Sequence, residues 1–198
     1  MNDYFAVFGL PRKLQVDLDG LQRRFYELSR QHHPDFHQMA GPDEQAATLE
    51  RSALVNRAYR ALRDPLARVE YLIALEEGRG AKEGASVKPK APIDLLEEML
   101  EVQESLEAAK GAGLDEASRA RLAEERKSLV MRQAAVEASI IARFADWDRA
   151  TGAGGDTAAL LQWLTQALAT RAYLRTVIDD LSEALGEDQD AHVSHRRH

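Results

Sequence analysis

Apolar residues recur at helical spacing along almost the whole chain, and this pattern restricts the possible folds more than any other feature. Leu21, Phe25 and Leu28 are an example, because steps of four and three residues place them on one face of a helix. No stretch shows the sustained two-residue alternation, rich in β-branched residues, that is typical of a half-buried strand. The sequence therefore predicts an all-α protein.

Glycine, proline and aspartate mark the ends of the helices in the N-terminal part. A short helix in "DYFAVFGLP" ends at Gly9, and the next helix begins after an N-cap at Asp17 or Asp19 and continues to His32. A second long helix covers about residues 43–63. Two long helices joined by a short connection predict an antiparallel helical hairpin.

The segment over residues 78–92, "GRGAKEGASVKPKAP", differs in composition from the helices on either side. Glycine, lysine, alanine and proline dominate it, which is typical of a linker between domains. We therefore predict an N-terminal domain over residues 1–77 and a C-terminal domain over residues 93–185. The last residues, 186–198, lack apolar content, and we expect them to be a disordered tail.

The C-terminal domain contains three helical patterns, over about 94–110, 115–149 and 157–185. The segments "KGAG" and "TGAGG" separate them and are typical of helix ends. Short connections make neighbouring helices antiparallel, so we predict an antiparallel three-helix bundle.

Composition excludes several classes of function. The chain has no cysteine, which excludes disulfides, thiolate metal sites and cysteine nucleophiles. A net charge of −7 argues against a general nucleic-acid binder, and no apolar run approaches the roughly 18 residues that a membrane helix needs. Asp3 stands where a signal peptide would carry basic charge. We expect a cytoplasmic monomer that binds neither nucleic acid nor membrane and carries no cofactor.

The histidine-rich segment "RQHHPDFHQ" is the main candidate site. His33 and His37 have the four-residue spacing of two metal ligands on one helix face, but Pro34 prevents a continuous helix between them. A catalytic pair of His33 and Asp35 is not accompanied by a nucleophile motif or a glycine-rich phosphate loop. The same segment could also be a plain connection between two helices, or a surface for a protein partner.

The partner interpretation has a physical basis. Proline fixes φ at the turn, so His33 and Asp35 would be presented with little conformational entropy left to lose on binding. Arg23 and Arg30 are seven residues apart on the preceding helix, with Arg24 beside them. A basic helix face next to a rigid tip would suit an acidic partner, although exposed arginines are also common on any solvated helix.

These features carry a resemblance to a known family. A helical hairpin with His33-Pro34-Asp35 at its tip resembles the J-domain of the DnaJ family. The segments "DYFAVFGLP", "RFYELSRQHHPD" and "SALVNRAYRALRDPLARVEYLIAL" closely resemble HscB-type co-chaperones of iron–sulfur cluster assembly. That family joins a J-domain to a C-terminal three-helix bundle, so the resemblance runs from Tyr4 to about Leu185. The glycine- and lysine-rich linker and the acidic, histidine-bearing tail depart from the family pattern.

The resemblance implies a function without catalysis by this chain. The J-domain would bind an ATP-loaded chaperone of the HscA or DnaK type and stimulate its ATP hydrolysis. His33 and Asp35 would dock on that chaperone, Pro34 would shape the tip, and Arg24 and Arg30 would steer the approach.

The helix over 94–110 carries a second candidate surface. Its core stripe comprises Leu95, Met99, Val102 and Leu106. Leu96 and Leu100 lie beside this stripe, with Glu101 and Glu104 on the next face. An apolar patch with an acidic rim is typical of a binding surface, although these leucines could also pack within the protein. The resemblance assigns Leu96, Leu100, Glu101, Glu104 and Tyr173 to binding of the iron–sulfur scaffold IscU.

Two functions of different classes also fit parts of the sequence. A general J-domain chaperone would use the C-terminal bundle to hold unfolded chains. A metal-dependent hydrolase would use the histidines at residues 32–37 and would require a stoichiometric metal ion.

Overall fold

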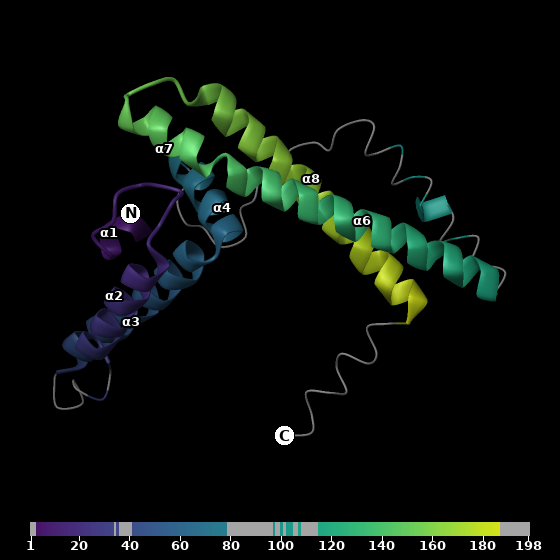
Figure 1. Cartoon of the computed structure of the whole chain (residues 1–198). Coiled ribbons are helices and arrows are strands. Elements are labelled where there is room, and N and C mark those ends of the chain that lie inside the picture. Colours follow the sequence, from purple (N-terminus) through teal and green to yellow (C-terminus); the bar gives the residue numbers. More distant parts are fainter. Residues whose placement is uncertain are drawn as a thin grey trace. The chain divides into compact units, whose positions relative to one another are not determined.

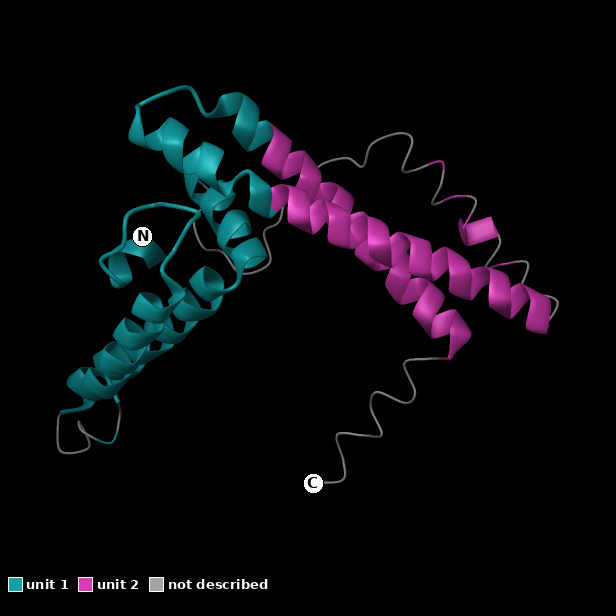
Figure 2. Cartoon of the chain, viewed as in Figure 1, with its two compact units in different colours: residues 1–85, 141–162 teal, residues 86–140, 163–198 magenta. Residues whose placement is uncertain are grey.

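The computed structural model describes residues 3–33, 35, 41–78, 97, 100, 102–104, 107 and 115–186. Within these ranges the chain is helical and contains no strand, so the predicted all-α class is confirmed. The chain divides into two compact units (Figure 2): residues 1–85 with 141–162, and residues 86–140 with 163–198. The first unit thus includes residues that the sequence placed in the C-terminal bundle.

The domain limits expected from the sequence stay predictions: an N-terminal domain over 1–77, a linker over 78–92, a C-terminal domain over 93–185 and a tail over 186–198. Residues 79–92 of the expected linker and residues 187–198 of the expected tail lie outside the described residues.

The first unit begins with a series of helices along the N-terminal part of the chain (Figure 1). They are α1 (Tyr4–Val7), α2 (Leu18–Gln31), α3 (Pro42–Arg63) and α4 (Pro65–Glu76). The carboxylate of Asp17 accepts a hydrogen bond from the Gly20 backbone N–H at 3.1 Å, which identifies Asp17 as the N-cap of α2. Asp64 caps α4 in the same way by accepting from Leu66 and Ala67.

Helices α2 and α3 lie side by side and form the predicted hairpin (Figure 1). The rings of Phe25 in α2 and Tyr59 in α3 stack with their centroids 4.0 Å apart. The buried residues of these two helices include Leu21 in α2 and Val55, Ala58 and Leu62 in α3. Apolar burial along the hairpin therefore fixes the two helices against each other.

Helices α1 and α4 are joined by an aromatic pair. The rings of Tyr4 and Tyr71 stack at 4.3 Å, and the Tyr4 backbone N–H donates to the Tyr71 hydroxyl at 2.8 Å. Phe5 contributes a second ring, 6.0 Å from Tyr71. These contacts give α1, which is only four residues long, the tertiary support that a short helix needs.

The helix predicted over 115–149 is two helices, α6 (Glu116–Ala142) and α7 (Phe144–Gly152), with a turn at Arg143. In α7, Phe144 and Trp147 are buried. The guanidinium of Arg68 in α4 lies over the Phe144 ring, 5.9 Å from its centroid. Helix α7 thus packs on α4 within the first unit, to which residues 141–162 belong.

Arg68 is buried, although it is charged. Its guanidinium donates hydrogen bonds to the backbone carbonyls of Leu62 and Leu14. These bonds compensate for part of the cost of removing the charge from water, while burial still lowers the pKa of Arg68. The residue connects the α3–α4 corner to the segment between α1 and α2.

The second unit is built on α6 and α8 (Ala158–Leu185), which are antiparallel. Arg119 near the start of α6 donates to the carbonyl of Leu185 at the end of α8, and Glu137 late in α6 pairs with Arg171 at 2.6 Å. The core between them comprises Val102, Leu122, Leu129, Leu174, Val177, Leu181 and Leu185. Val102 belongs to the helical residues 102–104, so the first predicted helix of the bundle contributes to the same core.

Candidate functional site

The candidate tip follows directly after α2. The helix ends at Gln31, His32 is its C-cap, and the backbone N–H of His32 donates to the Leu28 carbonyl. The next described residues, His33 and Asp35, expose 53% and 70% of their side chains. Pro34 and His37 lie outside the described residues. The hairpin thus presents an imidazole and a carboxylate to solvent at one end of α2.

The two exposed side chains also contact each other. The Asp35 backbone N–H donates to Nδ1 of His33 at 3.2 Å, and the Asp35 carboxylate lies 3.5 Å from the same atom. The tip therefore places an imidazole and a carboxylate in direct contact with each other at the surface.

A metal site at the tip would need several ligands close together. Among the described parts of the chain, no three histidine, aspartate or glutamate side chains lie close enough together to hold a metal ion. His37, one of the ligands considered from the sequence, lies outside those parts.

The arginines of α2 differ in their surroundings. Arg23 lies 3.8 Å from the Asp17 carboxylate, a long contact between two exposed groups. Arg30 is exposed in the last turn of the helix, next to the tip. Arg24 instead donates from Nη1 to the backbone carbonyl of Phe8 at 2.6 Å. The two predicted steering residues thus differ, because Arg24 bonds the Phe8 carbonyl while Arg30 lies beside the tip.

The second candidate surface lies in the second unit. Leu100 is 58% exposed and Glu104 is exposed, whereas Val102 between them is only 6% exposed. This confirms the predicted placement of Val102 in the core and of Leu100 away from it. Tyr173 is partly buried against the core that contains Val102. Leu96 and Glu101 lie outside the described residues.

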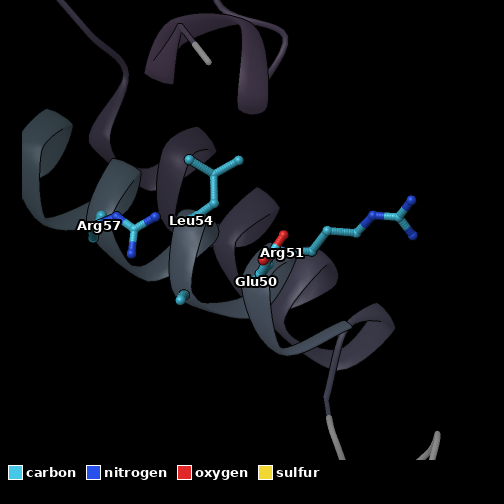
Figure 3. Close-up of a pocket in the computed structure, with 5 residues that line it drawn as sticks. Glu50, Arg51, Leu54 and Arg57 are labelled. Carbon is cyan, nitrogen blue, oxygen red and sulfur yellow. The ribbon is translucent and has the colours of Figure 1, made fainter. Parts of the chain in front are cut away.

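A pocket on α3 did not follow from the sequence (Figure 3). Its lining residues are Glu50, Arg51, Ala53, Leu54 and Arg57. Leu54 is only partly buried, whereas Val55 next to it in sequence is buried in the core. Because all five residues come from one helix, this depression does not enclose a ligand as a catalytic cleft does.

Neither α6 nor α8 is a membrane helix, although both are long. Among the described residues, no helix combines sufficient length with sufficient apolar content to cross a bilayer.

The resemblance of the sequence to the J-domain rests on a His-Pro-Asp segment that follows a helix. In the structure, His33 and Asp35 of this segment are exposed and come directly after α2.

No protein-family model matches the chain. Chaperone HscB from Vibrio cholerae shares its fold with a TM-score of 0.64 and 22% sequence identity, over 95% of this chain and 99% of that chain. The human co-chaperone protein HscB has a TM-score of 0.61 and 24% identity, over 92% of this chain and 81% of that chain. The fold is that of HscB co-chaperones, as the resemblance predicted.

Proposed function

We propose that this protein is a J-domain co-chaperone of iron–sulfur cluster assembly. It stimulates ATP hydrolysis by an HscA- or DnaK-type chaperone and delivers an IscU-type scaffold protein to that chaperone. It acts in the cytoplasm as a monomer and performs no catalysis of its own. No cofactor takes part, and neither nucleic acid nor membrane is a partner.

The observation that carries the proposal is the exposed pair His33 and Asp35 at the end of α2, in a chain with the HscB fold. A side chain that serves only the core would be buried, whereas these two are solvent-facing and contact each other. Pro34 stands between them in the sequence, and because a proline fixes its own φ, less conformational entropy is lost on docking. The docking residues are therefore His33, Pro34 and Asp35, with the charge of Arg30 beside them.

The second unit supports the delivery step. Leu100 exposes an apolar surface next to the exposed carboxylate of Glu104. Apolar contacts at the centre of an interface and charges at its rim are the usual arrangement of a protein-binding surface. Leu96, Glu101 and Tyr173 complete the proposed scaffold surface by the sequence resemblance.

The test is ATP hydrolysis by a purified HscA-type chaperone under single-turnover conditions. The full chain is added at increasing concentration, with and without a folded IscU-type scaffold. We expect stimulation by the chain alone and a further increase when the scaffold is present. An unchanged hydrolysis rate at every concentration would refute the co-chaperone function.

A denatured client protein, supplied in place of the scaffold, separates the proposal from a general J-domain chaperone. The proposed co-chaperone binds the folded scaffold and leaves the denatured client in solution. Binding of the denatured client but not of the scaffold would favour the general chaperone.

A further inference from the structure

Arg24 connects the middle of α2 to the end of α1. Its Nη1 donates to the carbonyl of Phe8, the C-cap residue of α1, at 2.6 Å. The last carbonyls of a helix have no partner within the helix, and an arginine side chain can satisfy them. The carbonyls of Phe5 and Ala6 already accept from Leu10 and Gly9, so Arg24 supplies the donor for the Phe8 carbonyl.

Gly9 adapts the chain to this contact in two ways. Its φ is +61°, a left-handed conformation that favours glycine. A Cβ at this position would also lie 2.8 Å from Nη1 of Arg24, closer than such atoms approach each other. Phe8, Gly9 and Arg24 thus form a latch between α1 and α2, which we call the α1–α2 latch.

We propose that Arg24 is a positioning residue, which holds α2 and its His33–Asp35 tip at a fixed orientation to α1, and that it does not act by electrostatic steering. This inference rests on the proposed function for the identity of the docking partner. Arg24 is exposed, as are Arg23 and Arg30 on the same helix, so the proposal rests on the hydrogen bond of Arg24 to the Phe8 carbonyl and not on burial of its charge. One N–H group of the guanidinium, at Nη1, makes the contact with the Phe8 carbonyl.

The substitution Arg24→Lys separates the two roles because it keeps the positive charge. The ammonium group is a point charge without the rigid fork of arginine, and its side chain is shorter. A steering residue would tolerate this change. A positioning residue would not, because the hydrogen bond to the Phe8 carbonyl is lost.

The functional experiment measures the co-chaperone concentration for half-maximal stimulation of the HscA-type chaperone at several salt concentrations. For Arg24→Lys we expect an increase of about tenfold at each salt concentration, the size expected for loss of one charge-assisted hydrogen bond. The dependence on salt should equal that of the wild type, because the charge is unchanged. The matched control Arg149→Lys, at an exposed arginine of α7 outside the docking residues, should behave like the wild type, and Arg30→Ala should show a weaker salt dependence.

Wild-type behaviour of Arg24→Lys, together with a weaker salt dependence of Arg24→Ala, would overturn the positioning role in favour of steering. Wild-type behaviour of both variants would overturn it as well.

A second measurement is independent of the chaperone. The unfolding free energies of Gly9→Ala, Arg24→Met and the double variant form a double-mutant cycle. Because a Cβ at residue 9 collides with Arg24, Gly9→Ala should destabilise the Arg24→Met background less than the wild type. If the effects of Gly9→Ala and Arg24→Met on the unfolding free energy are simply additive, the latch is overturned. Failure of the wild type to stimulate the chaperone would instead overturn the proposed function. If Gly9→Ala does not fold, faster hydrogen exchange of the Leu10 amide in Arg24→Lys supports the latch, and unchanged exchange overturns it.

Discussion

The carboxylate of Asp148 accepts hydrogen bonds from the backbone N–H groups of Leu14 and Gln15, at 2.7 and 2.9 Å. Leu14 is fully buried, and it precedes the N-cap of α2 by three residues. Its N–H would be without a partner if the carboxylate were absent, which is costly in a buried position. A side chain of α7 therefore fixes the segment that leads into the helix bearing the candidate tip.

We expect Asp148→Asn to lower the free energy of unfolding by about 2 kcal/mol, because an amide offers one acceptor where the carboxylate offers two. Urea denaturation measures this change. The matched control is Asp146→Asn, two residues earlier in α7, where the carboxylate pairs with Arg143 and Arg149 at the surface. Its effect should stay below about 1 kcal/mol. Equal effects of the two substitutions would mean that the bonds to Leu14 and Gln15 add nothing specific.

The phenol of Tyr71 predicts a loss of stability at alkaline pH. Its burial raises the pKa to about 12 from an ordinary value of 10.0. The folded protein thus holds this proton more tightly than the unfolded chain does. The resulting stability is fully present below pH 10 and is lost as the pH rises towards 12.

Unfolding measured between pH 10 and pH 12 tests this assignment. The variant Tyr71→Phe loses the hydrogen bond from the Tyr4 N–H and should be less stable than the wild type at neutral pH. It should also show a weaker pH dependence over this range, because one titrating group has been removed. If the unfolding free energy changes with pH equally in both proteins, burial does not raise the pKa of Tyr71.

Local signals in the sequence were sufficient for the helices of the N-terminal hairpin. An aspartate caps a helix with its own side chain by bonding amides a few residues away, so Asp17 could be identified as a candidate cap without knowledge of the fold. The positions of His33 and Asp35 followed from the proline between them and from the two helices around it.

Contacts between distant segments could not be predicted in this way. Asp148 and Leu14 are 134 residues apart in sequence, and an aspartate in a helix gives no sign of which amides it will meet. The same holds for Arg24, which looks like any other arginine on a solvated helix until the carbonyl of Phe8 is placed beside it. The turn at Arg143 was missed for the same reason, since the burial of Phe144 and Trp147 is a tertiary effect.

Because His33 at the tip is exposed, its substitution should affect chaperone stimulation without affecting the stability of the fold. We expect His33→Gln to abolish stimulation of the chaperone ATPase and to change the unfolding free energy by less than about 0.5 kcal/mol, because the side chain is exposed. His32→Gln is the matched control, since it makes the same chemical change at the C-cap of α2 and should retain stimulation. Normal stimulation by His33→Gln, or its unfolding, would remove the docking role.

The exposed leucine of the second unit gives the last prediction. Leu100→Ala should weaken binding of the IscU-type scaffold by about tenfold, or near 1.4 kcal/mol, while stimulation of the chaperone by the chain alone stays unchanged. Leu100 is largely exposed, so its truncation opens no cavity and should leave the melting temperature close to that of the wild type. The matched control is Leu181→Ala in the core, which should cost about 2–5 kcal/mol of stability. Melting and scaffold affinity are measured on the same preparation of each variant. If Leu100→Ala melts like the core variant, or binds the scaffold with unchanged affinity, the scaffold surface lies elsewhere.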